Sequence, residues 1–219
     1  MKNNQDYKNS ALEALRGNWA MAVVAAIVYF VIVAFCTTPS SLTSNGIFSV
    51  SPVLMLSVGG ATVLVALLFL MPLQTGYYNA FRKLYNEGDA DMTGNMFLLG
   101  FRNWGHIVWG MFLMGIFVFL WSLLLFIPGI VKAYSYAMTP YILVDRPDLS
   151  ANEAINLSRK MMKGRKFDLF YLQLSFIGWG LLCVVTLGIG FLWLSPYIMT
   201  AQASFYQDVK ADYEMKSVQ

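Results

Sequence analysis

Long apolar runs without any charged residue are the feature that most limits how this chain can fold. Residues 19–36 and 104–126 each contain no Lys, Arg, Asp or Glu. A helix of about 20 apolar residues crosses the hydrocarbon core of a bilayer. Since 58% of the residues are hydrophobic and 12% are charged, a soluble domain of this length would have a mostly apolar exterior. The sequence therefore predicts a membrane protein.

Six apolar runs alternate with short connections, and we predict an all-α, polytopic membrane helical bundle of three hairpins. The six predicted spans are residues 19–36, 53–73, 104–126, 130–144, 167–186 and 191–206. Pro128 and Gly129 leave room only for a hairpin turn, and residues 37–52 form an uncharged loop rich in Ser, Thr and Pro. Pro140 falls inside the fourth span, where neighbouring groups can satisfy the freed carbonyl.

Amphipathic segments precede the hairpins, and we predict that they lie on the membrane surface. They are residues 8–18, residues 92–103 and a helix after Ser150, where Glu153 completes a capping box. The third helix has one apolar stripe, formed by Ala151, Ala154, Ile155, Ser158, Met161 and Met162. Polar and basic residues occupy its opposite face, as in helices that lie in a membrane interface.

The positions of the Lys and Arg residues predict the orientation. Of 15 such residues, all except Lys132 lie in the surface segments, next to them or in the tail. Basic loops stay in the cytoplasm, so we predict that both termini are cytoplasmic. The first apolar run lacks a small-residue cleavage site, and we expect it to remain as an anchor.

An internal repeat is a further expectation for this chain, which we interpret as a single integral membrane domain, residues 1–219. The proposed units are residues 8–86, 92–145 and 150–210, each a surface helix, a polar hinge, an aromatic residue and a hairpin. The aromatic residues after the hinges are Trp19, Trp104 and Phe167. The alternative is that any multi-span protein reuses basic and aromatic anchors at the interface.

A basic cluster near the third surface helix is the first candidate site. It consists of Arg159, Lys160, Lys163, Arg165 and Lys166. Each basic residue close to an anionic membrane contributes roughly 1 kcal/mol of attraction. We therefore predict contact with the headgroups of anionic lipids. Binding of nucleic acid is the weaker interpretation, because no nucleic-acid reading motif is recognisable.

A second candidate site is a pocket formed by Lys132, Tyr134 and Tyr136. Lys132 is the one cation within a predicted span, and in a pocket it would attract an anionic group. The alternative is that its long side chain reaches the outer headgroups.

No catalytic or metal site is predicted. His106 is the only histidine, and a metal site needs several converging ligands. Asp168, beside Arg165 and Lys166, is expected to form a salt bridge, and Cys36 and Cys183 are expected to pack as small apolar residues. We expect no cofactor.

Three stretches carry a resemblance to a known family. They are IPGIVKAYSYAMTPYILVD, LSANEAINLSRKMMKGRKFDLFYLQLSFIGWGLL and TLGIGFLWLSPYIMTAQASFYQDV. They resemble the bacterial membrane proteins grouped as "domain of unknown function 975". The resemblance extends over about the whole chain and is sharpest from residue 127 to 208. It implies a polytopic protein of the bacterial inner membrane and supplies no activity or site residue.

The sequence leaves three functional interpretations open. The first is a non-enzymatic protein that acts on membrane lipids or on a membrane protein partner through the basic helix. The alternative is a small-solute or anion transporter or channel that uses Lys132 and the nearby tyrosines. An intramembrane enzyme is disfavoured, because no paired catalytic groups occur.

Overall fold

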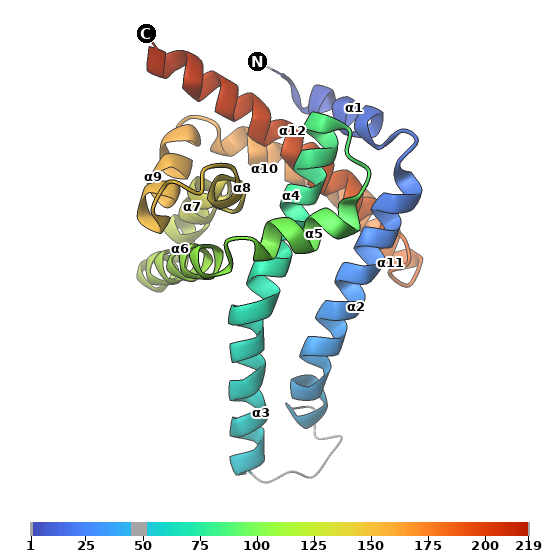
Figure 1. Cartoon of the computed structure of the whole chain (residues 1–219), viewed down its shortest axis with the longest axis vertical. Helices are drawn as coiled ribbons and strands as arrows, with labels where there is room; N and C mark the ends of the chain where they lie inside the picture. The colour runs from blue at the N-terminus through green and yellow to red at the C-terminus, as the bar shows by residue number, and fades with distance from the viewer. Residues whose placement is uncertain (1, 45–51, 219) are drawn as a thin grey trace.

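The computed structural model describes residues 2–44 and 52–218, and all regular elements in these ranges are helical (Figure 1). In chain order they are α1 (Asn4–Leu15), α2 (Trp19–Ser44), α3 (Pro52–Val65), the π-helical turn η1 (Ala66–Leu70), α4 (Met71–Glu87), α5 (Met92–Phe101), α6 (Trp104–Leu124), α7 (Phe126–Tyr136), α8 (Thr139–Asp145), α9 (Ala151–Met161), α10 (Lys166–Leu174), α11 (Ile177–Val185) and α12 (Phe191–Val218). No strand occurs in the described ranges, so the all-α class is confirmed.

Four of the described helices are long and apolar enough to cross a membrane. They are Trp19–Thr37, Ser57–Glu87, Trp104–Leu124 and Lys166–Val185, which correspond to the first, second, third and fifth predicted spans. The fourth and sixth predicted spans do not meet this standard. Both the length and the composition of the four helices indicate a membrane protein.

The first hairpin is longer than the sequence predicts. Helix α2 continues to Ser44, so the prediction of a loop from residue 37 is wrong for residues 37–44. Residues 45–51 lie outside the described ranges. The return from α3 through η1 into α4 is one continuous helical path, which ends where Gly88 adopts a left-handed φ of 68°.

The fourth predicted span is broken in two, which corrects the prediction of one helix over residues 130–144. Helix α7 ends at Tyr136, and Pro140 lies in the first turn of α8. Proline has no N–H and is well placed at a helix start. The turn between α6 and α7 is at Leu125 instead of Pro128, and a Cβ on Gly129 would lie 2.7 Å from the Cα of Ser122.

The third hairpin also departs from straight spans. The fifth predicted span bends between α10 and α11, where Ser175 and Phe176 interrupt the regular helix. Helix α12 continues to Val218, well beyond the predicted end at residue 206. Its second half carries charged residues and packs against α1.

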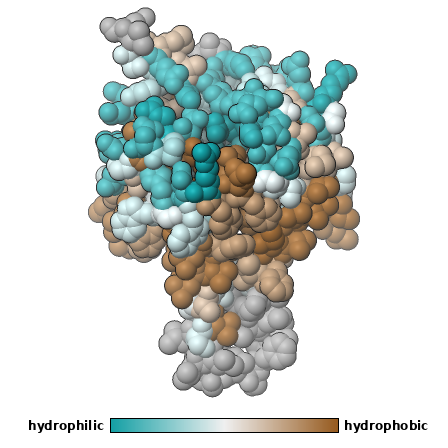
Figure 2. Space-filling model, viewed as in Figure 1, coloured by the Kyte–Doolittle hydropathy of each residue, from teal (hydrophilic) through white to brown (hydrophobic). Residues whose placement is uncertain are grey.

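The apolar hairpins extend outward from a shared core. In Figure 1, α2 and α3 extend downward together, whereas α6 runs across that direction. In an apolar 18-residue stretch of each candidate span, only 17–22% of the residues are buried. Figure 2 shows hydrophilic residues over the upper part of this view and an apolar band below them. A parallel bundle of six spans is therefore not confirmed, but charged and apolar regions are clearly separated.

The returning helices α4, α8 and α12 meet in the core. Tyr141 of α8 stacks on Tyr206 of α12, with ring centroids 4.9 Å apart, and on Tyr78 of α4 at 6.0 Å. The side-chain amide of Asn79 donates to the Pro140 carbonyl at 2.9 Å. These contacts join helices that are far apart in the sequence.

Helix α5 packs closely against α4, and it is therefore less exposed than the predicted surface helix over residues 92–103. Gly76 and Gly100 permit the approach, because a Cβ on Gly76 would overlap the Met96 carbonyl oxygen and lie 2.9 Å from the Gly100 Cα. Met92 and Met96 are fully buried in the same contact.

We expect Gly76→Ala to lower the free energy of unfolding by about 1–3 kcal/mol, because the added methyl group meets backbone that has no room to yield. Denaturant unfolding of the purified protein in lipid nanodiscs measures this loss. Gly105→Ala is the matched control, since no atom lies within 4 Å of its added Cβ. Equal stability of the two variants would contradict the close α4–α5 contact.

Candidate functional site

Helix α9 is held in place by its start and by its buried face. The backbone N–H of Ser150 donates to Glu153 Oε2 at 2.8 Å, which forms the predicted capping box. Ser158, fully buried, donates to the Ser135 carbonyl at 3.0 Å and accepts from the Met138 N–H at 3.2 Å. One hydroxyl thus satisfies two backbone groups at the break between α7 and α8 and attaches α9 to it. All six residues of the predicted apolar stripe are buried.

The hinge between α9 and α10 is fixed by one buried arginine. Gly164 has a φ of 84°, in the left-handed region that favours glycine. The next side chain, Arg165, is 4% exposed and pairs with Asp208 of α12 at 2.5 Å and with Asp168 at 3.2 Å. It also donates to the Tyr7 hydroxyl of α1 at 2.9 Å. Arg165 therefore ties the hinge to α1 and α12, and the predicted salt bridge of Asp168 is confirmed.

A groove of about 440 Å³ lies between this hinge and α7, and we call it the hinge groove. Its walls are mainly apolar or aromatic, and two lysines belong to its lining. The lining consists of Ile130, Val131, Tyr134, Lys163, Gly164, Lys166, Phe167 and Phe170. Tyr134 donates to Gln173 Oε1 at 2.7 Å, which fixes its ring against α10. An amphipathic ligand with a negative group matches this combination of surfaces.

The predicted basic cluster divides into two groups. Arg159, Lys160 and Lys163 are exposed and Lys166 is partly exposed, so these four remain available to a headgroup. Arg165 is not available, because it is buried among its acidic partners. The buried arginine orients the hinge, and the exposed cations surround it.

The predicted pocket of Lys132, Tyr134 and Tyr136 does not form as one site. The Lys132 ammonium lies 4.2 Å from the centroid of the Trp121 ring, in a cation–π contact between α6 and α7. Tyr136 is 5% exposed and packs against Phe117. Tyr134 lines the hinge groove, together with Lys163 and Lys166.

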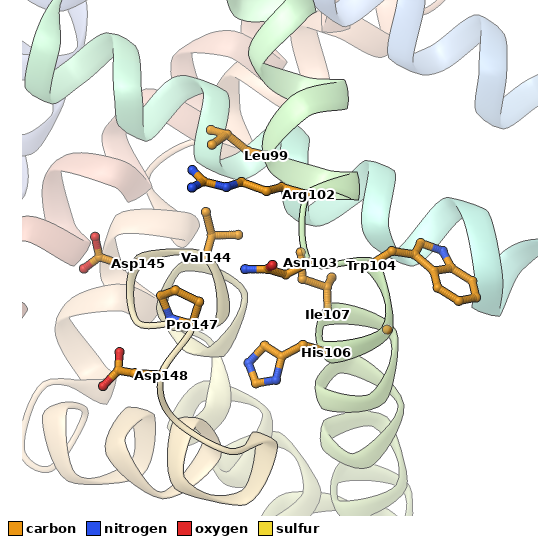
Figure 3. A pocket seen from close by; sticks show the side chains of 11 residues that line it. Leu99, Arg102, Asn103, Trp104, His106, Ile107, Val144, Asp145, Pro147 and Asp148 are labelled. Carbon is orange, nitrogen blue, oxygen red and sulfur yellow. The ribbon is translucent and has the colours of Figure 1, made fainter.

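A second cavity, of about 830 Å³ and with both polar and apolar walls, lies between the α5–α6 hinge and the loop after α8 (Figure 3). Arg102, Asn103 and His106 line one side, opposite Asp145 and Asp148. His106 Nε2 is buried and has no hydrogen-bond partner among the described residues. Both segments are recognisable in the sequence as polar. Asn103 and Asp145 are 42 positions apart, however, and no local pattern predicts that they lie close together.

Asp145, which lines this second cavity, is held by three polar partners. It pairs with Arg82 of α4 at 2.8 Å and with Lys210 of α12 at 2.6 Å, and it accepts from the Tyr206 hydroxyl at 2.9 Å. Burial alone would raise the pKa of this carboxyl, but the Lys210 hydrogen bond, the Arg82 charge and the Tyr206 hydrogen bond together hold the pKa below its ordinary value. Asp145 is therefore a charged junction of three helices.

Comparison with known proteins yields one match. The family model described as "Protein of unknown function (DUF975)" matches residues 123–213, which include α7 to α11 and most of α12. This match confirms the family resemblance for that part of the chain. No curated protein and no solved structure matches the chain.

We expect Asp145→Asn to lower the free energy of unfolding at neutral pH by about 2 kcal/mol, because Arg82 and Lys210 lose their shared carboxylate. The contribution of Asp145 is present above the ordinary carboxyl pKa of 3.8 and is lost as the pH falls through the lower pKa of the folded protein. The free energy of unfolding, measured from pH 7 to acid, should therefore decrease less with falling pH in the variant than in the unchanged protein.

The control for this variant is Asp212→Asn, which removes a carboxylate whose partner, Lys216, has a side chain that is 69% exposed. Such surface pairs contribute little to stability. An Asp145→Asn variant as stable as the Asp212→Asn variant would exclude the junction.

Proposed function

We propose that this chain, whose residues 123–213 belong to the DUF975 family of unknown function, is a non-enzymatic integral membrane protein that binds anionic phospholipid. The phospholipid phosphate would lie between Lys163 and Lys166, and an acyl chain would follow the apolar walls of the hinge groove. The surface cations Arg159 and Lys160 would add attraction to an anionic leaflet.

The observation that carries this proposal is the pairing of lysines with apolar walls in one groove. Phe167 is 74% exposed and Phe170 40% exposed, although both belong to the lining. Apolar side chains so exposed fit hydrocarbon as their surroundings better than water. Among the lining residues there is no carboxylate, histidine or cysteine that would serve as acid, base or nucleophile. The lining therefore matches a ligand that is both apolar and negatively charged.

We further propose six spans in the inner membrane of a bacterium, with both termini in the cytoplasm. Each outgoing apolar helix has a returning partner in contact with it: α3 for α2, α7 for α6 and α12 for α11. The start of α1 and the end of α12 lie at the same end of the molecule, away from the far ends of α2 and α3 (Figure 1). This common end is also the hydrophilic one.

The alternative function is the transport of a small solute or anion. The polar cavity beside Arg102, Asn103 and His106 favours it, because these groups face space large enough for a small molecule. Uptake of radiolabelled anions into vesicles that contain the protein would distinguish this function from lipid binding alone.

A phosphatase that is active only outside the cytoplasm tests the threading. Fused at Ser44 it should be active, and fused after residue 219 it should be inactive, because the proposal puts these positions on opposite sides of the membrane. A cytoplasmic reporter at the same two positions is the control and should give the reverse pattern. Activity of the phosphatase at the C-terminal fusion would exclude the proposed orientation.

For the lipid proposal, we expect that changing Lys163 and Lys166 to Gln weakens the preference for phosphatidylglycerol over phosphatidylcholine by about tenfold or more. The reason is that two cations next to the phosphate contribute roughly 1 kcal/mol each. Competition between the two lipids for the protein in mixed nanodiscs, with fluorescent phosphatidylglycerol as the reporter, measures this preference. It should also decrease with added salt.

The matched control removes two cations elsewhere, Arg146→Gln and Lys216→Gln. Arg146 pairs with Asp148 and Lys216 pairs with Asp212, and both basic side chains are exposed. Neither residue lines the hinge groove. An unchanged preference in the Lys163 and Lys166 variant, or an equal loss in the control, would disprove site-specific binding.

A further inference from the structure

We propose that the hinge groove is one of three quasi-equivalent lateral grooves, and that each holds an acyl chain of a phospholipid. This inference rests on the proposed lipid-binding function and adds its stoichiometry. The three grooves follow the three sequence units, because each lies between the hinge of one unit and the returning arm of another.

The second groove, of about 420 Å³, involves the hinge of the first unit. Trp19 and Leu12 form one wall, and residues of α11 and α12 form the other. Two further tryptophans, Trp179 and Trp193, line this second wall. The first unit thus faces both arms of the third unit, the outgoing helix α11 and the returning helix α12.

The third groove, of about 280 Å³, involves the hinge of the second unit. Leu67 and Leu68 of η1 form one wall, and Trp104, Val108 and Trp109 belong to the other. The Trp104 indole N–H donates to the Leu68 carbonyl at 2.6 Å, at the π-helical turn. A π-helical turn disturbs the regular hydrogen bonding of a helix, and the Trp104 indole donates to a backbone carbonyl of this turn.

A single arrangement accounts for all three grooves. The aromatic residue that follows each hinge, Trp19, Trp104 or Phe167, lines a groove in every case. The returning arm of the first unit lies at the hinge of the second unit, and the returning arm of the second unit lies at the hinge of the third. The returning arm of the third unit lies at the hinge of the first. The pairing of hinges and arms is therefore cyclic along the chain, and no local sequence rule requires it.

The chemistry of the grooves selects a phospholipid as the occupant. Their walls are mainly apolar, and aromatic rings at this position are typical of the level of the headgroups. Each hinge also carries cations: Arg16, Arg102, or Lys163 with Lys166. Arg16 and Arg102 are exposed and form no ion pair with any residue that the structure describes. A negative phosphate above a hydrocarbon chain complements the two lysines that line the hinge groove. Arg16 and Arg102 do not line the other two grooves, but they precede the groove-lining Trp19 and Trp104 by three and two residues in the sequence.

Native mass spectrometry of the protein released from nanodiscs tests the stoichiometry. With phosphatidylglycerol we expect up to three retained lipids per chain. Leu67→Trp, Val131→Trp and Leu182→Trp each add bulk to one groove and should each lower the maximum by one. Val185→Trp is the matched control, because Val185 is 80% exposed and lines none of the three grooves. Phe replaces Trp in any variant that does not fold.

The outcomes separate this inference from the proposed function. Three retained lipids with equal retention of phosphatidylcholine would support the three grooves and contradict the anionic preference. One retained lipid, lost only in Val131→Trp, would support the hinge groove and overturn the threefold arrangement. Retention that no groove variant changes, or no retention at all, would overturn both. Loss in the Val185→Trp control equal to that in the groove variants would also overturn the inference.

Discussion

Asp145 holds the centre of this protein together, because one carboxylate is shared by cations from two other helices. Arg82 comes from α4 and Lys210 from α12, while Asp145 ends α8. The stacked rings of Tyr141 and Tyr206 continue the same junction into the core. The three returning helices are therefore fixed to one another at their polar ends, and the hairpins begin from this fixed point. Loss of this charge would leave two cations facing each other without a counter-ion.

The most apolar parts of the candidate spans bury few residues, and this determines which surroundings suit them. In an apolar 18-residue stretch of each candidate span, 17–22% of the residues are buried. In water such surface would favour aggregation, whereas hydrocarbon satisfies it without further packing. The grooves between the arms are part of the same open surface. Lipid bound in them would complete the contacts that the hairpins do not make with each other.

Some features of the candidate site depend on local sequence alone, and others depend on residues far apart in the chain. The capping box at Ser150, the apolar stripe of α9 and the exposed lysines follow from local pattern and are found in the structure. The five basic residues, however, look alike in sequence although Arg165 is buried by Asp208, 43 positions away. The sequence places Tyr134 in a pocket with Lys132 and Tyr136, whereas the groove that Tyr134 lines is formed with α10 and the preceding hinge.

The sequence by itself determined the helical class, the apolar runs and the side on which the charges collect, because these depend on composition and on periodicity within one segment. Tertiary structure decided where the helices break and which segments meet. At the end of α7, the Ser158 hydroxyl bonds to the Ser135 carbonyl and the Met138 N–H. Pro140 follows in the first turn of α8. Arg82, Asp145 and Lys210 come from three different helices and form their ion pairs only in the folded chain. Such long-range pairing leaves no periodic trace in the residues that take part in it.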